Sequence, residues 1–141
     1  MTRKELIAAL EASDGPSRRL DAEIAKDAGW HRVEPRHAKR SGGAWIAPED
    51  FLGVMSSGAP ILDSLHGTDM HKDVPRFTSS IDAALTLVPV GWIWRHAPNR
   101  YVKHTVSIAP SAEHGGYVAE VDSNPAIAIC IAALRAMEDV K

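Results

Sequence analysis

The residues best suited to chemistry form the run Arg76-Phe77-Thr78-Ser79-Ser80, directly before an Ala-rich apolar stretch. The free amides of a helix N-terminus, together with an arginine and hydroxyl groups, can hold a phosphate or a carboxylate. Thr78 or Ser79 can equally cap the helix, while Asp82 complements its positive end. Capping alone accounts for these residues and is the favoured interpretation. Arg76, Thr78 and Ser79 are the candidate anion ligands.

The segment HGTDMHKD carries a second set of polar side chains, His66, Asp69, His71 and Asp73. Imidazole and carboxylate groups at such spacing can bind zinc or a redox-active metal. The segment lacks a cysteine pair and an HExxH frame, so the motif is weak. We therefore expect no metal site and no cofactor.

Trp92 and Trp94 alternate along a predicted strand and so fall on one of its faces. Tryptophan can stack on a nucleotide base or anchor a protein partner. Filling the core between a sheet and a helix is the favoured interpretation.

Basic residues gather between Arg32 and Arg40, where Arg36 and Lys39 also lie. This cluster could contact a nucleic-acid backbone or an acidic protein surface, although a solvated loop is favoured. Arg36 and Arg40 are the candidate partner contacts. The formal net charge of −2 gives no electrostatic case for nucleic acid or for an anionic membrane as the main partner.

Signatures of catalysis are absent from the sequence: it has no GxSxG, P-loop or dinucleotide-binding motif. The single cysteine, Cys130, lies on the apolar stripe of a predicted helix, as a buried small hydrophobe would. It cannot form an intramolecular disulfide, which fits a reducing compartment. No apolar run reaches the ~18 residues needed to span a bilayer, and the N-terminus does not read as a signal peptide. We expect a non-enzymatic cytoplasmic protein.

The elements that would position these residues begin with two helices. Thr2 and Glu5 have capping-box spacing, and the first helix should end near Ser13. A second helix should start at Pro16 and stop at Gly29. Further along, we expect a loop over 30–43, an edge strand at 44–46, a helical turn over 51–55, and a helix from about 78 that ends at Pro89.

The second half predicts an antiparallel meander of strands at 90–94, 101–108 and 117–121, with turns at 97–100 and 110–116. Asn124 and Pro125 then start a closing helix. The predicted fold class is α+β, a helix–sheet–helix sandwich whose antiparallel sheet of three to four strands is flanked by helices. We expect one domain over residues 1–141, irregular at about 42–73.

Three stretches together resemble the phage ABA-sandwich domain family: ELIAALEASDGPSRRLDAEIA (5–25), VPRFTSSIDAALTLVP with the Trp-bearing strand after it, and NPAIAICIAALRAME (124–138). The family pattern is a PxYT/S-S-LDAAL helix, a strand with tryptophan and a PALALCxAALRA helix. The likeness hardly extends to residues 42–73. It implies a helix–sheet–helix fold and a phage or prophage origin, without a defined activity.

Two functions follow as hypotheses. The first is a phage accessory protein that binds a host protein, for example to inhibit a bacterial defence system such as CRISPR-Cas; it is motivated by the resemblance, the small size and the absence of catalytic motifs. The alternative is a protein that sequesters a small nucleotide signal, with Arg76 at the phosphate and Trp92 or Trp94 on the base. A third is a virion or assembly component that acts as a homo-oligomer.

Overall fold

The computed structural model describes residues 1–34, 36, 44–62, 73–98, 104–111, 116–121 and 124–139. It divides into two compact units. The first unit joins Met1–Ile24 to Arg76–Lys141, and the second is Ala25–Pro75. The described residues form four α-helices and three small antiparallel sheets, so the predicted α+β class is confirmed. The sandwich arrangement and the single-domain boundary stay predictions.

The first two helices begin at side-chain caps. Helix α1 (Arg3–Glu11) has the predicted capping box, in which Thr2 Oγ1 accepts from the Glu5 amide at 3.2 Å and Glu5 Oε2 accepts from the Thr2 amide at 2.9 Å. Helix α2 (Arg18–Asp27) starts two residues after Pro16, because the Ser17 hydroxyl caps it by accepting from the Leu20 amide.

Gly29 ends α2 as predicted. Its φ of +97° is left-handed. The Trp30 amide donates to the Ala25 carbonyl at 2.9 Å, and the Gly29 amide donates to the Lys26 carbonyl at 3.2 Å. This pair of hydrogen bonds is the Schellman arrangement that glycine favours.

Helix α4 (Ile81–Leu85) is shorter than predicted, and its cap is Ser80 rather than Thr78 or Ser79. The Ser80 hydroxyl accepts from the Ala83 amide at 3.2 Å. Beyond Leu85 the backbone forms hydrogen-bonded turns up to Val88. The helix therefore ends several residues before Pro89, which was the predicted end.

The three-stranded sheet of the first unit is the predicted antiparallel meander, in the order β5-β6-β7. Its strands are β5 (Ile93–Pro98), β6 (His104–Ala109) and β7 (Tyr117–Val121). The prediction of a strand from Val90 is wrong, because Gly91 has φ +85° and the Trp92 amide closes a turn onto the Pro89 carbonyl. Ala97 and Pro98 extend β5 instead of turning, while residues 99–103 lie outside the described part.

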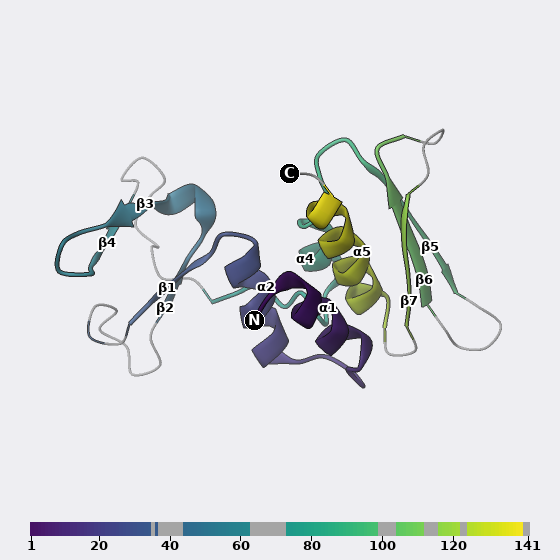
Figure 1. Cartoon of the computed structure of the whole chain (residues 1–141), viewed down its shortest axis with the longest axis horizontal. Coiled ribbons are helices and arrows are strands. Elements are labelled where there is room, and N and C mark those ends of the chain that lie inside the picture. The colour runs from purple at the N-terminus through teal and green to yellow at the C-terminus, as the bar shows by residue number, and fades with distance from the viewer. Residues whose placement is uncertain are drawn as a thin grey trace. The chain divides into compact units, whose positions relative to one another are not determined.

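Helix α5 (Pro125–Asp139) forms the centre of this unit. Asn124 caps it as predicted, with Oδ1 accepting from the Ile127 amide at 2.9 Å. Residues 126–134 of α5 are all buried. The helix packs on β6 and β7, and it also contacts α1 and α4, as Figure 1 shows. The helix covers the face of the sheet that carries four buried side chains: Val106, Ile108, Ala119 and Val121.

The second unit contains two hairpins, of which the sequence predicts only the strand at 44–46. Strand β1 (His31–Val33) pairs with β2 (Ala44–Ile46), and β3 (Phe51–Val54) pairs with β4 (Pro60–Leu62). The loop prediction for 30–43 is thus wrong over β1, whereas the strand at 44–46 is confirmed.

The helical turn predicted over 51–55, starting on Pro48-Glu49-Asp50, is helical only at its start. A short 3₁₀ helix, η1 (Pro48–Asp50), precedes β3, and β3 itself is extended. Gly53 sits at a register shift between the two strands with φ +142°, a conformation that glycine tolerates. Phe51 and Leu62 pack against a small core, composed of Val33, Ala44 and Ile46.

Candidate functional site

The predicted anion ligands are split between the surface and the interior. Arg76 and Ser79 are exposed, whereas Thr78 is fully buried. The Thr78 hydroxyl accepts from the Ser17 amide at 2.8 Å and lies 2.8 Å from Asp21 Oδ1. This hydroxyl is therefore engaged within the first unit. Because α4 has only five residues, its N-terminus also offers a weak dipole to an anion.

Asp21 is the buried charge of this region, and it is not among the residues that the sequence offers as candidates. Its side chain accepts from the Thr78 amide at 2.7 Å, and its Oδ2 lies 2.9 Å from Arg18 Nη1. Only 1% of Asp21 is exposed. A buried carboxylate with such partners fixes the chain around it. Its signal in the sequence was faint: an acidic residue in the buried stripe between Leu20 and Ile24.

Helix α5 and its cap also bind the backbone of Phe77 and Thr78. The Asn124 Nδ2 donates to the Thr78 carbonyl at 3.1 Å, and the Cys130 thiol donates to the Phe77 carbonyl at 3.3 Å. Burial raises the pKa of the Cys130 thiol well above its ordinary range, and the Asp21 carboxylate adds to this effect. The thiol is protonated at neutral pH and is a poor nucleophile, in agreement with the predicted structural role.

The two candidate tryptophans lie at the edge of the meander. Trp94 pairs with Ile108 and so belongs to the face that α5 covers further along, yet 39% of Trp94 is exposed. Trp92 precedes β5, and its ring stacks on Tyr117 with centroids 6.1 Å apart. The structure thus places both residues at the margin of the core rather than at its centre.

The remaining candidates are dispersed. Arg36 is exposed, as is Arg32 on β1, while Arg40 lies outside the described residues. Asp73 is exposed, and the other members of the HGTDMHKD set, His66, Asp69 and His71, also lie outside the described part. In the ranges that the structure describes, no group of three or more His, Cys, Asp or Glu side chains is placed to hold a metal.

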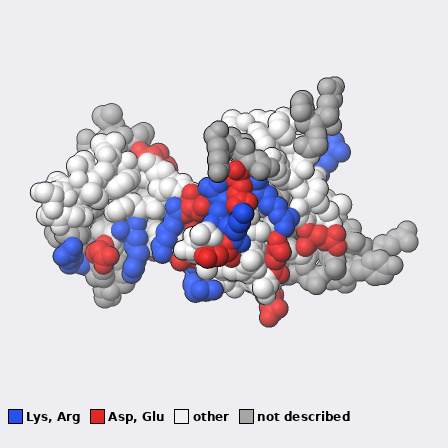
Figure 2. All heavy atoms as spheres, in the orientation of Figure 1, with Lys and Arg blue, Asp and Glu red and all other residues white. Residues whose placement is uncertain are grey.

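The hairpin β3–β4 presents a surface that the sequence reasoning missed. Residues 51–62 contain no charged residue, and four of their apolar side chains are exposed by 39–64%: Leu52, Val54, Met55 and Ile61. We call these four side chains the hairpin patch. Figure 2 shows an area with few charged atoms over this hairpin, whereas charges of both signs crowd the region of α1 and α2. The available signal was the uncharged run itself.

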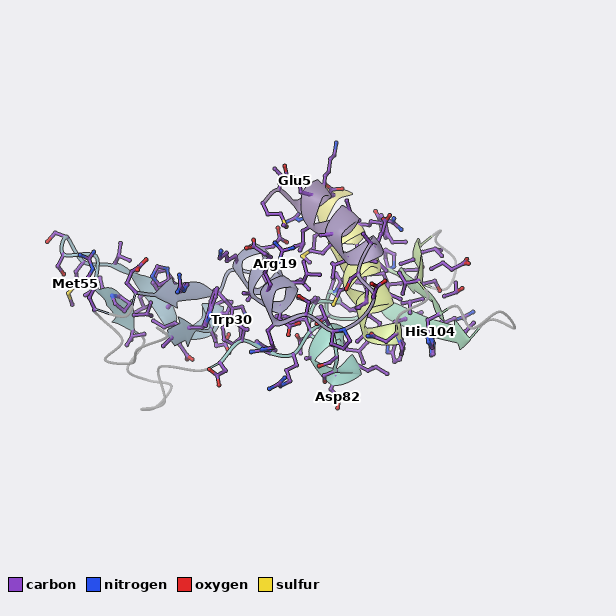
Figure 3. All side chains as sticks on the ribbon, turned by 90° about the horizontal axis from the view of Figure 1, so that it is seen from below. Glu5, Arg19, Trp30, Met55, Asp82 and His104 are labelled. Carbon is purple, nitrogen blue, oxygen red and sulfur yellow. The ribbon has the colours of Figure 1, made fainter. Side chains whose placement is uncertain are left out.

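A tight turn holds the tip of the hairpin. The Met55 amide donates to the Ala59 carbonyl at 2.8 Å, and the Gly58 amide donates to the Met55 carbonyl at 2.9 Å. Gly58 adopts φ +89°, which completes the reversal. Met55 lies at this tip, as Figure 3 shows. The hairpin patch is thus carried on a backbone that is closed by its own hydrogen bonds.

No protein-family model, no curated protein and no solved structure matches this chain. Among the helices in the described ranges, none is both long and apolar enough to cross a membrane.

Proposed function

We propose that this protein is a non-enzymatic binding protein that docks onto a host protein through the hairpin patch. The observation that carries this proposal is the exposure of Leu52, Val54, Met55 and Ile61 on a hairpin without charges. Exposed apolar surface beyond scattered single side chains is typical of protein–protein interaction sites. Burial of such surface is worth about 25 cal/mol per Å² before the costs of association.

The absence of charge within residues 51–62 favours a protein partner over a nucleic acid. Docking an apolar surface on this hairpin would desolvate no ion of the hairpin itself, so the main cost of burying charged groups does not arise there. A phosphate backbone, in contrast, is bound chiefly by lysine and arginine. The hairpin patch therefore fits an apolar surface on a protein.

The resemblance to phage ABA-sandwich proteins supports the biological setting. In this proposal the chain is a phage or prophage accessory protein in the bacterial cytoplasm, and its partner is a component of a host defence system, CRISPR-Cas being one example. Residues 42–73, which contain the hairpin, are also where the resemblance fades. Partner-specific surfaces are expected to vary in this way while a shared core is kept.

The test compares two Val→Asp variants that are matched in residue type and exposure. Val54 belongs to the hairpin patch and Val118 to strand β7, and each is 53% exposed. The tagged full chain and both variants are used to capture proteins from a lysate of the bacterial host, followed by quantitative mass spectrometry. We expect Val54→Asp to capture at least tenfold less of the specific partner than the unchanged chain does, because an aspartate would be desolvated in the apolar interface. Val118→Asp should retain it.

Native mass spectrometry of the purified chain distinguishes a host protein from two other binding partners, a second copy of the chain and a nucleotide. Equal capture by Val54→Asp and the unchanged chain would contradict the proposal. A wild-type dimer that Val54→Asp dissociates would assign the hairpin patch to a second copy of the chain and would contradict a host partner. A retained mass of nucleotide size would favour the small-molecule alternative, which would then make Arg76 the residue to change first.

A further inference from the structure

Two histidines meet across strands β5 and β6. His96 Nε2 and His104 Nδ1 are 3.0 Å apart, and the ring centroids are separated by 5.2 Å with 27° between the ring planes. In the register, His96 pairs with Val106 and His104 pairs with Pro98, so the two histidines are diagonal neighbours on one face of the sheet. Both side chains are half-buried. Figure 3 labels His104 on this part of the sheet.

The contact between these rings requires complementary protonation. A neutral imidazole has one N–H donor and one acceptor nitrogen, so one ring donates a single proton to the lone pair of the other. The facing nitrogens, His96 Nε2 and His104 Nδ1, therefore share one proton. Nothing in the proposed docking function uses this pair.

The same spacing fits two ligands of one metal ion. Imidazole nitrogens bind zinc at about 2.0–2.1 Å, and two such ligands at roughly a right angle are about 3 Å apart. Cross-strand pairing holds both backbone positions in register, so only modest rotation of the rings is needed to direct both lone pairs at one ion. Imidazole is a ligand that suits zinc and copper.

We propose that His96 and His104 form a two-histidine site for a divalent transition metal, in which the shared proton moves to the other nitrogen of its own ring and the ion takes its place. Their register neighbours on this face include Val106 and Val121, which supply no ligand. With no third His, Cys, Asp or Glu grouped there in the described residues, water or an incoming ligand completes the coordination. Such a site is open and exchangeable, unlike a four-ligand structural zinc centre.

The experiment uses the full chain after treatment with a chelator, and Zn²⁺ as the probe. Long-range ¹H–¹⁵N NMR of the imidazoles should show zinc-dependent shifts of His96 Nε2 and His104 Nδ1, with one proton on the other nitrogen of each ring once zinc is bound. Isothermal titration calorimetry then measures zinc affinity for the unchanged chain, His96→Gln and His104→Asn. We expect each substitution to weaken binding at least tenfold, because one ligand cannot chelate.

A double variant, His66→Asn with His71→Asn, is the control, since it alters the other histidine-containing candidate and should leave the affinity unchanged. Zinc shifts confined to other histidines, or equal affinity in His96→Gln and His104→Asn, would overturn the proposal. Absence of zinc binding by the unchanged chain would overturn it as well. Since the NMR assignment is made on the unchanged chain, it decides the question even where a variant is unstable.

Discussion

At the scale of single residues, hydroxyl groups that the sequence offers as ligands serve the interior instead. Thr78 looked equivalent to Ser79, since both precede the apolar stretch of α4 and both can accept a hydrogen bond. In the structure Thr78 is buried with Asp21, while Ser79 is exposed. Local sequence could not separate them, because Asp21 is 57 positions away and reaches Thr78 only through the tertiary fold.

Thr78→Val tests this assignment. The substitution keeps the shape of the side chain and removes the hydroxyl, so Asp21 Oδ1 and the Ser17 amide each lose a buried partner. We expect the free energy of unfolding in urea to fall by about 1–3 kcal/mol. Ser79→Ala, at the exposed neighbouring hydroxyl, should stay within about 0.5 kcal/mol of the unchanged chain. A similar loss in both variants would contradict a specific role for Thr78.

At the scale of elements, three helix termini followed from local chemistry, whereas the caps Ser17 and Ser80 and the strand β1 did not match the prediction. Thr2, Gly29 and Asn124 stand where the sequence placed them, because a cap depends on residues within one turn. Strand β1 was missed, since its three residues are extended only through their pairing with β2. The helical turn predicted over 51–55 has a different explanation. The spacing of the apolar residues there suits both the period of a helix and that of a strand.

Gly116, directly before β7, lies very close to the end of β6. A Cβ at this position would lie 2.3 Å from the Ile108 carbonyl oxygen and 3.0 Å from Ala109 Cβ. We therefore expect Gly116→Ala to destabilise the fold by about 1–3 kcal/mol in urea unfolding, because a backbone atom cannot move aside cheaply. Gly15→Ala is the control, since nothing lies within 4 Å of its Cβ. It should be neutral or stabilising by up to about 1 kcal/mol; equal losses would argue against the close approach.

The candidate sites also differ in whether local sequence or the tertiary fold brings their residues together. Arg76 and Ser79 reach the surface as an anion ligand would, but the fold places Thr78 inside. The His96–His104 pair could not be foreseen, because eight positions of sequence separate two residues that only the β5–β6 register joins. The hairpin patch was within reach of sequence reasoning only through its uncharged run. The sequence predicts a helical turn over Leu52, Val54 and Met55 and no pattern after Gly58, so it does not indicate the hairpin.

At the scale of the whole molecule, the two units differ in how their cores are built. In the first unit, residues 126–134 of α5 are buried together between the sheet and the helices α1 and α4. In the second, Val33, Ala44 and Ile46 form a small core beneath strands of three or four residues. Few buried apolar contacts imply a low cost of local opening.

Amide hydrogen exchange, read by mass spectrometry on the full chain, measures this difference. Peptides from α5 should exchange most slowly, since their hydrogen bonds open only with the core of the first unit. Peptides that cover β3 and β4 should exchange at least tenfold faster. Equal protection of the two regions would show that the hairpin is as stable as the central helix. The same measurement with a captured partner present should slow exchange in the hairpin if the hairpin patch is the docking surface.

The first unit is built from two separated parts of the chain, with Ala25–Pro75 between them. During translation, α1 leaves the ribosome long before α5, which supplies its partner surface. At about 5–20 residues per second, the apolar side chains Leu6, Ile7 and Leu10 wait for several seconds without that surface. We therefore expect the nascent chain to depend on chaperones that shield exposed apolar segments until α5 has been made.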